Sequence, residues 1–188
     1  MRPGLVIFAL WPLWAISWFG TAWWAAPTEK KVDLRRELGY RVVLAVGSVA
    51  LFSPAHGYQG PLRLWRVGWI GAWGCVAVMI LGFSFCWWAR IHLGRLWSMR
   101  VTKKEGHHVV DTGPYGVVRH PIYAGIIAAA IGTAVAKGTI LGIGGAGLLT
   151  IGLVMKARLE EAWLRAQLGT EYETYRKRVP MLVPFAPR

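Results

Sequence analysis

Long blocks of apolar residues are the feature that most restricts how this chain can fold. A helix needs about 20 residues to cross the roughly 30 Å hydrocarbon core of a bilayer, and several blocks reach or approach that length. Hydrophobic residues make up 55% of the 188 residues and charged residues 16%, against about a quarter in a soluble domain. The blocks predict an all-α membrane protein with about five transmembrane helices, at about 5–26, 41–56, 67–91, 121–136 and 139–157.

The fourth and fifth blocks are separated only by Lys137 and Gly138, so they are expected to form a tight antiparallel hairpin. Small residues let helix backbones approach closely in a membrane. Four such residues occur in the fifth block, namely Gly142, Gly144, Gly145 and Gly147. We interpret residues 1–188 as a single membrane domain, with a three-helix N-terminal part at 1–91 and a C-terminal part at 92–188 that carries the functional motifs.

Basic residues dominate the charged set, with a net charge of +13. They lie in the connections between apolar blocks and not on a polar face, so they do not indicate a nucleic-acid partner. Cytoplasmic connections of membrane proteins carry an excess of Lys and Arg. With the N-terminus outside, the outer segments hold four of the 22 Lys and Arg. We therefore expect an integral membrane protein with its C-terminus in the cytoplasm, in the cytoplasmic membrane if the chain is prokaryotic.

The connection before the fourth block carries the first functional motif. Gly113 and Pro114 predict a turn, and Arg119-His120-Pro121 leads into a helix with proline in its first turn, where a missing N–H costs nothing. A helix N-terminus is electropositive and has free N–H groups, so with Arg119 it predicts a site for a carboxylate or phosphate. The alternative is that these side chains only anchor the helix at the membrane interface.

Glu160 and Glu161 are the second motif, because the chain has only nine acidic residues. The predicted hairpin brings them back beside Arg119 and His120. A carboxylate there would bind an ammonium group or ribose hydroxyls. The alternative is a charge-balanced helix end, with Lys156 and Glu160 forming an i,i+4 pair.

The five histidines do not predict a metal site. His107 and His108 are adjacent and would point apart on an extended loop, with no spaced Cys or carboxylate partner. The glycines at 142–147 do not follow a strand, so they do not indicate a dinucleotide-binding fold.

The C-terminal half resembles a family, the isoprenylcysteine carboxyl methyltransferases with their phospholipid N-methyltransferase relatives. The similarity runs over residues 89–98, 106–115, 119–123, 158–161 and 168–180, in that order and spacing. It implies an integral-membrane methyltransferase whose last two spans and cytoplasmic loops enclose S-adenosylmethionine.

The resemblance also implies site residues. By position, the cofactor would contact His107, His108, Val109, Val110, Tyr115, His120, Pro121, Ile122, Tyr123 and Glu160. The predicted catalytic set is Arg119, Lys156, Arg158 and Glu161. Relatives carry an Arg about one helical turn before the glutamates. This chain has Lys156 at that position, and its nearest Arg, Arg158, is shifted from it by two residues.

The acceptor is predicted to be lipophilic and to come from the bilayer. A carboxylate is ionised at pH 7 and needs only a cation to orient it, whereas an amine must lose a proton to a base. Clustered cations therefore favour carboxyl O-methylation of an isoprenylcysteine-like substrate. The alternatives are a phospholipid amine N-methyltransferase, a non-catalytic lipid-binding scaffold and a nicotinamide-dependent membrane reductase.

Overall fold

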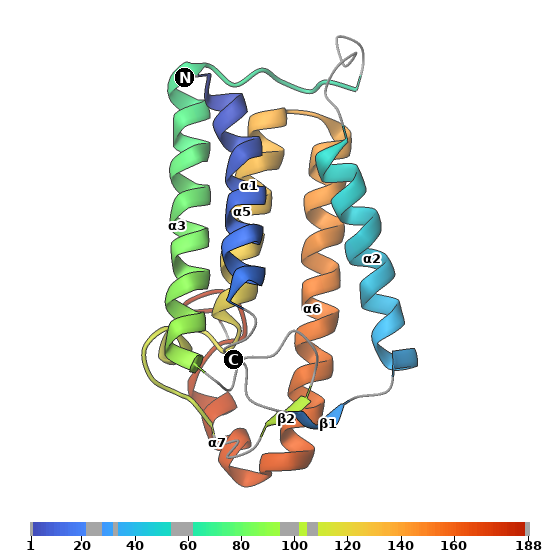
Figure 1. Cartoon of the computed structure of the whole chain (residues 1–188), viewed down its shortest axis with the longest axis vertical. Coiled ribbons are helices and arrows are strands. Elements are labelled where there is room, and N and C mark those ends of the chain that lie inside the picture. The colour runs from blue at the N-terminus through green and yellow to red at the C-terminus, as the bar shows by residue number, and fades with distance from the viewer. Residues whose placement is uncertain are drawn as a thin grey trace.

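In the computed structural model, the described residues are 2–21, 28–31, 34–53, 62–94, 102–104 and 109–186. Five long helices lie along the long axis and alternate in direction (Figure 1). They are α1 (Pro3–Gly20), α2 (Leu34–Phe52), α3 (Trp69–Leu93), α5 (Pro121–Lys137) and α6 (Ile140–Leu168). The short α4 (Pro114–Val117) and α7 (Thr170–Arg178) lie at the end where α6 finishes.

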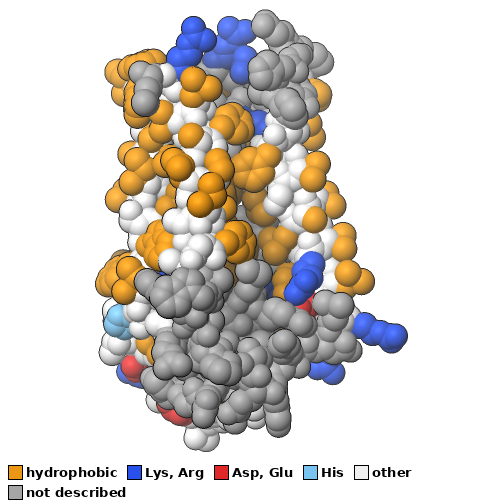
Figure 2. All heavy atoms as spheres, in the orientation of Figure 1, with side chains coloured by type: hydrophobic (Ala, Val, Ile, Leu, Met, Phe, Trp, Pro, Cys, Tyr) orange, Lys and Arg blue, Asp and Glu red, His pale blue; other side chains and the backbone are white. Residues whose placement is uncertain are grey.

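The all-α membrane architecture is confirmed. By length and composition α1, α3 and α6 can cross a membrane, and α5 is a shorter apolar helix. Hydrophobic side chains cover the long flank of the bundle, and Lys and Arg gather toward its two ends (Figure 2). The predicted number of five spans stays a prediction. The first turns of α2 carry charged residues, so its apolar part is shorter than the helix.

Helix boundaries differ from the predicted blocks where polar residues continue a helix. α2 begins at Leu34 and not near 41, and Arg41 pairs there with the buried Glu37. α6 joins the predicted fifth block to the amphipathic segment after it and runs 29 residues to Leu168. At 1.5 Å per residue that is about 43 Å, longer than the roughly 30 Å thickness of an apolar core. α1 ends at Gly20, and residues 22–27 lie outside the described residues.

A two-stranded ribbon was not predicted. β1 (Thr28–Lys31) pairs antiparallel with β2 (Thr102–Lys104). The ribbon connects the segment between α1 and α2 to the segment between α3 and α4, at the same end as α7 (Figure 1). It therefore ties the N-terminal half to the C-terminal half outside the helix bundle.

The tight hairpin between α5 and α6 is confirmed. Gly138 turns the chain in the left-handed region, with φ 59°, and the Thr139 side chain accepts a hydrogen bond from the Gly142 amide to cap α6. The expectation that all four nearby glycines serve this hairpin is wrong. A short loop fixes the direction of α6 but not which face meets which neighbour, and Gly145 meets α2 at Leu51, while Gly144 and Gly147 face open space.

Glycine contacts bring two helix pairs very close. A Cβ at Gly47 of α2 would lie 2.8 Å from the Leu149 amide nitrogen of α6, and one at Gly82 of α3 would lie 2.6 Å from the Gly125 carbonyl oxygen of α5. α1 covers the α3–α5 pair, where Trp11 donates a hydrogen bond to Thr133 at 3.0 Å. The bundle is therefore built from two close pairs, α2 with α6 and α3 with α5.

We predict that Gly82→Ala destabilises the bundle, because the added methyl group must push α3 away from α5. Overpacking of this kind costs about 1–3 kcal/mol. Gly74, on the same helix, has nothing within 4 Å of an added Cβ and supplies the matched control. Thermal unfolding in detergent should show a lower midpoint for Gly82→Ala than for the wild type. The midpoint of Gly74→Ala should equal that of the wild type. Equal midpoints for the two variants would contradict the close α3–α5 contact.

Candidate active site

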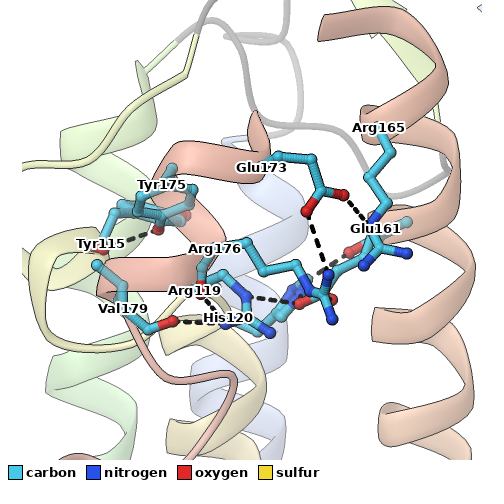
Figure 3. A network of polar contacts seen from close by, with 10 residues as sticks. Tyr115, Arg119, His120, Glu161, Arg165, Glu173, Tyr175, Arg176 and Val179 are labelled. Carbon is cyan, nitrogen blue, oxygen red and sulfur yellow. Dashed lines mark hydrogen bonds and ion pairs between the residues drawn. The ribbon is translucent and has the colours of Figure 1, made fainter. Parts of the chain in front are cut away.

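Four of the predicted site residues lie together at the end of the bundle where α5 begins, namely Tyr115, Arg119, His120 and Glu161 (Figures 1 and 3). Pro121 occupies the first turn of α5, as predicted, and His120 is its N-cap, with φ −124° and ψ 65°. The backbone amides of Arg119 and His120 donate to the carbonyls of Pro180 and Met181, at 2.8 Å and 3.1 Å. The segment after α7 therefore runs beside the start of α5.

Arg119 joins three parts of the chain (Figure 3). Its Nε donates to Glu161 Oε1 of α6 at 2.7 Å, and its Nη1 donates to the carbonyls of Arg176 and Val179. The residue is only 8% exposed. Arg119 thus holds the C-terminal segment against α5 and α6, an arrangement that the sequence motif did not predict.

Glu161 is the buried partner of this cluster, at 7% exposure. Besides Arg119, it has His120 Nε2 at 3.2 Å from Oε1 and Arg176 Nε at 3.7 Å from Oε2. Burial by itself would raise the pKa of Glu161, but hydrogen bonds from His120 and Arg119 and their charges outweigh it and lower the pKa. The ionised form of Glu161 is therefore favoured near neutral pH.

Glu160, one residue earlier, faces a different set of groups. Tyr123 OH donates to its Oε1 at 2.6 Å, and His120 Nδ1 lies 3.6 Å from its Oε2. Lys156 Nζ is 3.9 Å from Oε1, so the i,i+4 contact considered from the sequence is present. The rings of His120 and Tyr123 stack, with centroids 5.4 Å apart and planes 3° apart. The two adjacent glutamates thus lie in different environments, and His120 contacts both carboxylates.

Tyr115 lies on α4 and contacts α7 through Tyr175. It is 8% exposed, its carbonyl accepts from Tyr175 OH at 2.7 Å, and burial raises the pKa of its hydroxyl. His92 of α3 supports the turn before it, with Nε2 2.8 Å from Thr112 Oγ1. Tyr175 packs in a separate apolar cluster that the motif analysis missed, made of Tyr172, Tyr175 and Val179 with Val109, Leu164 and Leu168.

The remaining predicted residues differ in whether the structure describes them and in how exposed they are. His107 and His108 lie outside the described residues. Val109 is half-buried, and its amide donates to Glu171 at 3.2 Å. Lys156 has a side chain only 13% exposed, whereas Arg158 is exposed. Of these two candidate cations, it is Lys156 that lies near Glu160 and the Tyr123 ring. Within the described part of the chain, no three His, Cys, Asp or Glu side chains are grouped as a metal site would require.

Comparison with known proteins agrees with this architecture. The family model described as the isoprenylcysteine carboxyl methyltransferase family matches residues 75–165. Protein-S-isoprenylcysteine O-methyltransferase B of Arabidopsis thaliana is 32% identical over 149 residues, which cover 78% of this chain and 74% of that protein. The protein-S-isoprenylcysteine O-methyltransferase of Schizosaccharomyces pombe is 34% identical over 107 residues, covering 53% of this chain and 43% of that protein.

A bacterial relative is named for a different acceptor. Methanethiol S-methyltransferase 2 of Bradyrhizobium diazoefficiens is 30% identical over 135 residues, covering 66% of this chain and 51% of that protein. The chain thus spans about half the length of the second and third relatives. Its apolar helices and these relatives together define an integral-membrane methyltransferase. More narrowly, the chain belongs to the isoprenylcysteine carboxyl methyltransferase family.

We predict a pH-dependent contribution of Glu161 to stability, tested with Glu161→Gln. Because the folded-state pKa is lowered, the ionised carboxylate stabilises the fold above its unfolded-state pKa of about 4.3 and loses this contribution as the pH falls through the folded-state pKa. The difference should be about 1–3 kcal/mol near pH 7. Thermal midpoints of both proteins in detergent should differ by a constant amount between pH 7 and 5 and converge below about pH 4. A gap that widens in acid would contradict this.

Proposed function

We propose that this chain transfers the methyl group of S-adenosylmethionine to a lipophilic carboxylate of the isoprenylcysteine type. The observation that carries the proposal is the meeting of Glu160 with Tyr123, His120 and Lys156, where α6 passes the start of α5. The place of this cluster, at the end of membrane helices, suits an acceptor whose apolar part stays in the bilayer.

The residues around Glu160 fit the polar parts of this cofactor. The Glu160 carboxylate, 18% exposed, would hold its ammonium group or ribose hydroxyls. Backbone amides in the first turn of α5, at Ile122 and Tyr123, lack partners within the helix and would hold its carboxylate. Tyr115 and the stacked His120 and Tyr123 offer flat surfaces for adenine. The loop through His107, His108, Val109 and Val110 would complete the enclosure, as the family resemblance implies.

When bound, the cofactor supplies a methyl group on a sulfonium, already activated for in-line displacement. A bound carboxylate would attack that methyl carbon directly, with the electron pair of the broken C–S bond leaving on sulfur, so the chain would need to move no proton. The chain then contributes mainly alignment and exclusion of water. Among the described residues, Lys156 would align the acceptor and Glu160 would align the cofactor.

The environment of Glu161 favours a carboxylate acceptor over an amine. An amine must lose a proton to a base before it can attack. Glu161 is a poor base near pH 7, because its pKa is lowered and Arg119 and His120 hydrogen-bond its Oε1. We therefore assign Glu161 and Arg119 to holding the site together. An ionised carboxylate needs only an orienting cation, which Lys156 provides.

We further propose that the N-terminus lies outside and the C-terminus in the cytoplasm, so that the cofactor reaches the site from the cytoplasm. The alternation of helix directions brings α7 and the start of α5 to one end of the bundle (Figure 1). Arg63 lies at the opposite end, where it bridges to Thr139 beside the hairpin turn. This orientation places most Lys and Arg on the cytoplasmic side.

The direct test is titration of the purified protein with S-adenosylmethionine. We predict saturable binding, weakened about tenfold in Glu160→Gln, since one charge-assisted hydrogen bond is worth about 1.5–3 kcal/mol. Glu173→Gln is the matched control, because Glu173 pairs with Arg165 and Arg176 on the surface. Absence of saturable binding in the wild type would refute the proposal in favour of a lipid-binding scaffold, and thermal stabilisation by NADPH alone would indicate a reductase.

A second prediction separates the two candidate cations. Lys156→Met should raise the KM for a lipophilic carboxylate by tenfold or more, because it removes the cation near Glu160 and Tyr123. Arg158→Met should leave the KM within twofold of the wild type, because Arg158 is exposed. Initial rates with S-farnesyl-N-acetylcysteine provide the measurement. The opposite ranking of the two variants would assign the acceptor to Arg158.

A further inference from the structure

The first turns of α2 present two residues toward the bundle. Glu37 and Tyr40 are 0% and 5% exposed, while Arg35, Arg36, Leu38, Gly39 and Arg41 are exposed. Their i,i+3 spacing puts both on one helix face. A large aromatic side chain is thus buried at the polar end of a helix that carries no recognised motif.

Close packing places Tyr40 beside the candidate site. α2 lies against α6 through Gly47 and Gly152, and a Cβ at Gly39 would lie 3.7 Å from Met155 Cε. Lys156, the next residue on α6, has its Nζ 6.0 Å from the Tyr40 ring centroid and 5.3 Å from the Tyr123 ring centroid. The ammonium group is therefore flanked by aromatic rings from α2 and α5, both within the range of cation–π attraction.

An aromatic surround suits a cation that must also bind an anion. A carboxylate in close contact would neutralise the ammonium, whereas a ring attracts it through its quadrupole and leaves its net charge. Glu160 Oε1 stands 3.9 Å from Lys156 Nζ, a long ion pair, and the same oxygen accepts from Tyr123 OH. The two rings thus flank the same ammonium group that pairs with Glu160.

The depth of Lys156 also fits an acceptor drawn from the bilayer. Lys156 is 16 residues after Ile140, the first residue of α6. At 1.5 Å per residue this is about 24 Å along an apolar core of roughly 30 Å. With Ile140 at the outer edge of that core, the ammonium would lie near its inner edge, where the polar end of a lipophilic acceptor would stop.

We propose that Tyr40 is a positioning residue for the acceptor: its ring, opposite Tyr123, fixes the Lys156 ammonium that binds the acceptor carboxylate. This inference rests on the proposed function. It makes α2 part of the acceptor side of the site, although nothing in its sequence pattern marks it so. Tyr40 acts through Lys156, so it should affect acceptor affinity and leave cofactor affinity unchanged.

The test compares Tyr40→Phe, which keeps the ring, with Tyr40→Leu and Tyr40→Met, which remove it. With S-farnesyl-N-acetylcysteine, the ring-lacking variants should raise the acceptor KM three- to tenfold, with S-adenosylmethionine affinity within twofold of the wild type. Tyr40→Phe should match the wild-type KM. In a Lys156→Met background, Tyr40→Leu should not raise the acceptor KM any further. If Tyr40 served only in packing, its substitution would raise the KM whether or not Lys156 is present.

Two results would overturn the inference alone: an unchanged KM in both ring-lacking variants, or an equal rise in KM with and without Lys156. Loss of cofactor binding in both variants would also overturn it, by showing that Tyr40 supports the whole fold. Failure of the proposed function looks different, because the wild type itself would then not methylate the carboxylate. Methylation of methanethiol in its place would indicate a thiol acceptor.

Discussion

The ion pair between Arg119 and Glu161 is the contact on which the rest of the site depends. Both residues are almost fully buried, and taking two charges out of water is costly unless each is fully hydrogen-bonded. Here Arg119 also binds two backbone carbonyls of the C-terminal segment, and Glu161 also meets His120 and Arg176. Removing either partner would leave a buried charge uncompensated, so the start of α5, the end of α6 and α7 are fixed together.

This cluster explains why adjacent glutamates are not equivalent. Successive residues on a helix point about 100° apart, so Glu161 faces the α7 segment while Glu160 faces Tyr123 and Lys156. Arg119, the expected anion ligand, already donates through Nε and Nη1. Under the proposed function the cofactor would therefore depend on Glu160 and the first turn of α5, with Arg119 keeping that turn in position.

The sequence predicted the parts of the site that local rules determine. Pro121 marks the start of α5 and Gly138 marks the hairpin turn, and together they return Glu160 and Glu161 to His120. The docking of α7 on Arg119 was not predictable in this way, because it uses backbone carbonyls, which carry no sequence signature. Tyr40 was missed for another reason: its neighbours on α6 depend on which face of α2 packs there, and two distant glycines decide that.

The position of α2 links the N-terminal and C-terminal parts of the chain. The division into 1–91 and 92–188 follows the motifs, but α2 packs along α6 and β1 pairs with β2, so the first part reaches into the second. The start of α5 and the end of α6 are tied by buried charges and tolerate little change. The Tyr40 ring on α2 packs into the bundle, and its hydroxyl interacts with the neighbouring Arg41. Under the proposed function, exchanging this ring would change the surroundings of the Lys156 ammonium, which also pairs with Glu160, and would therefore change the affinity for the acceptor.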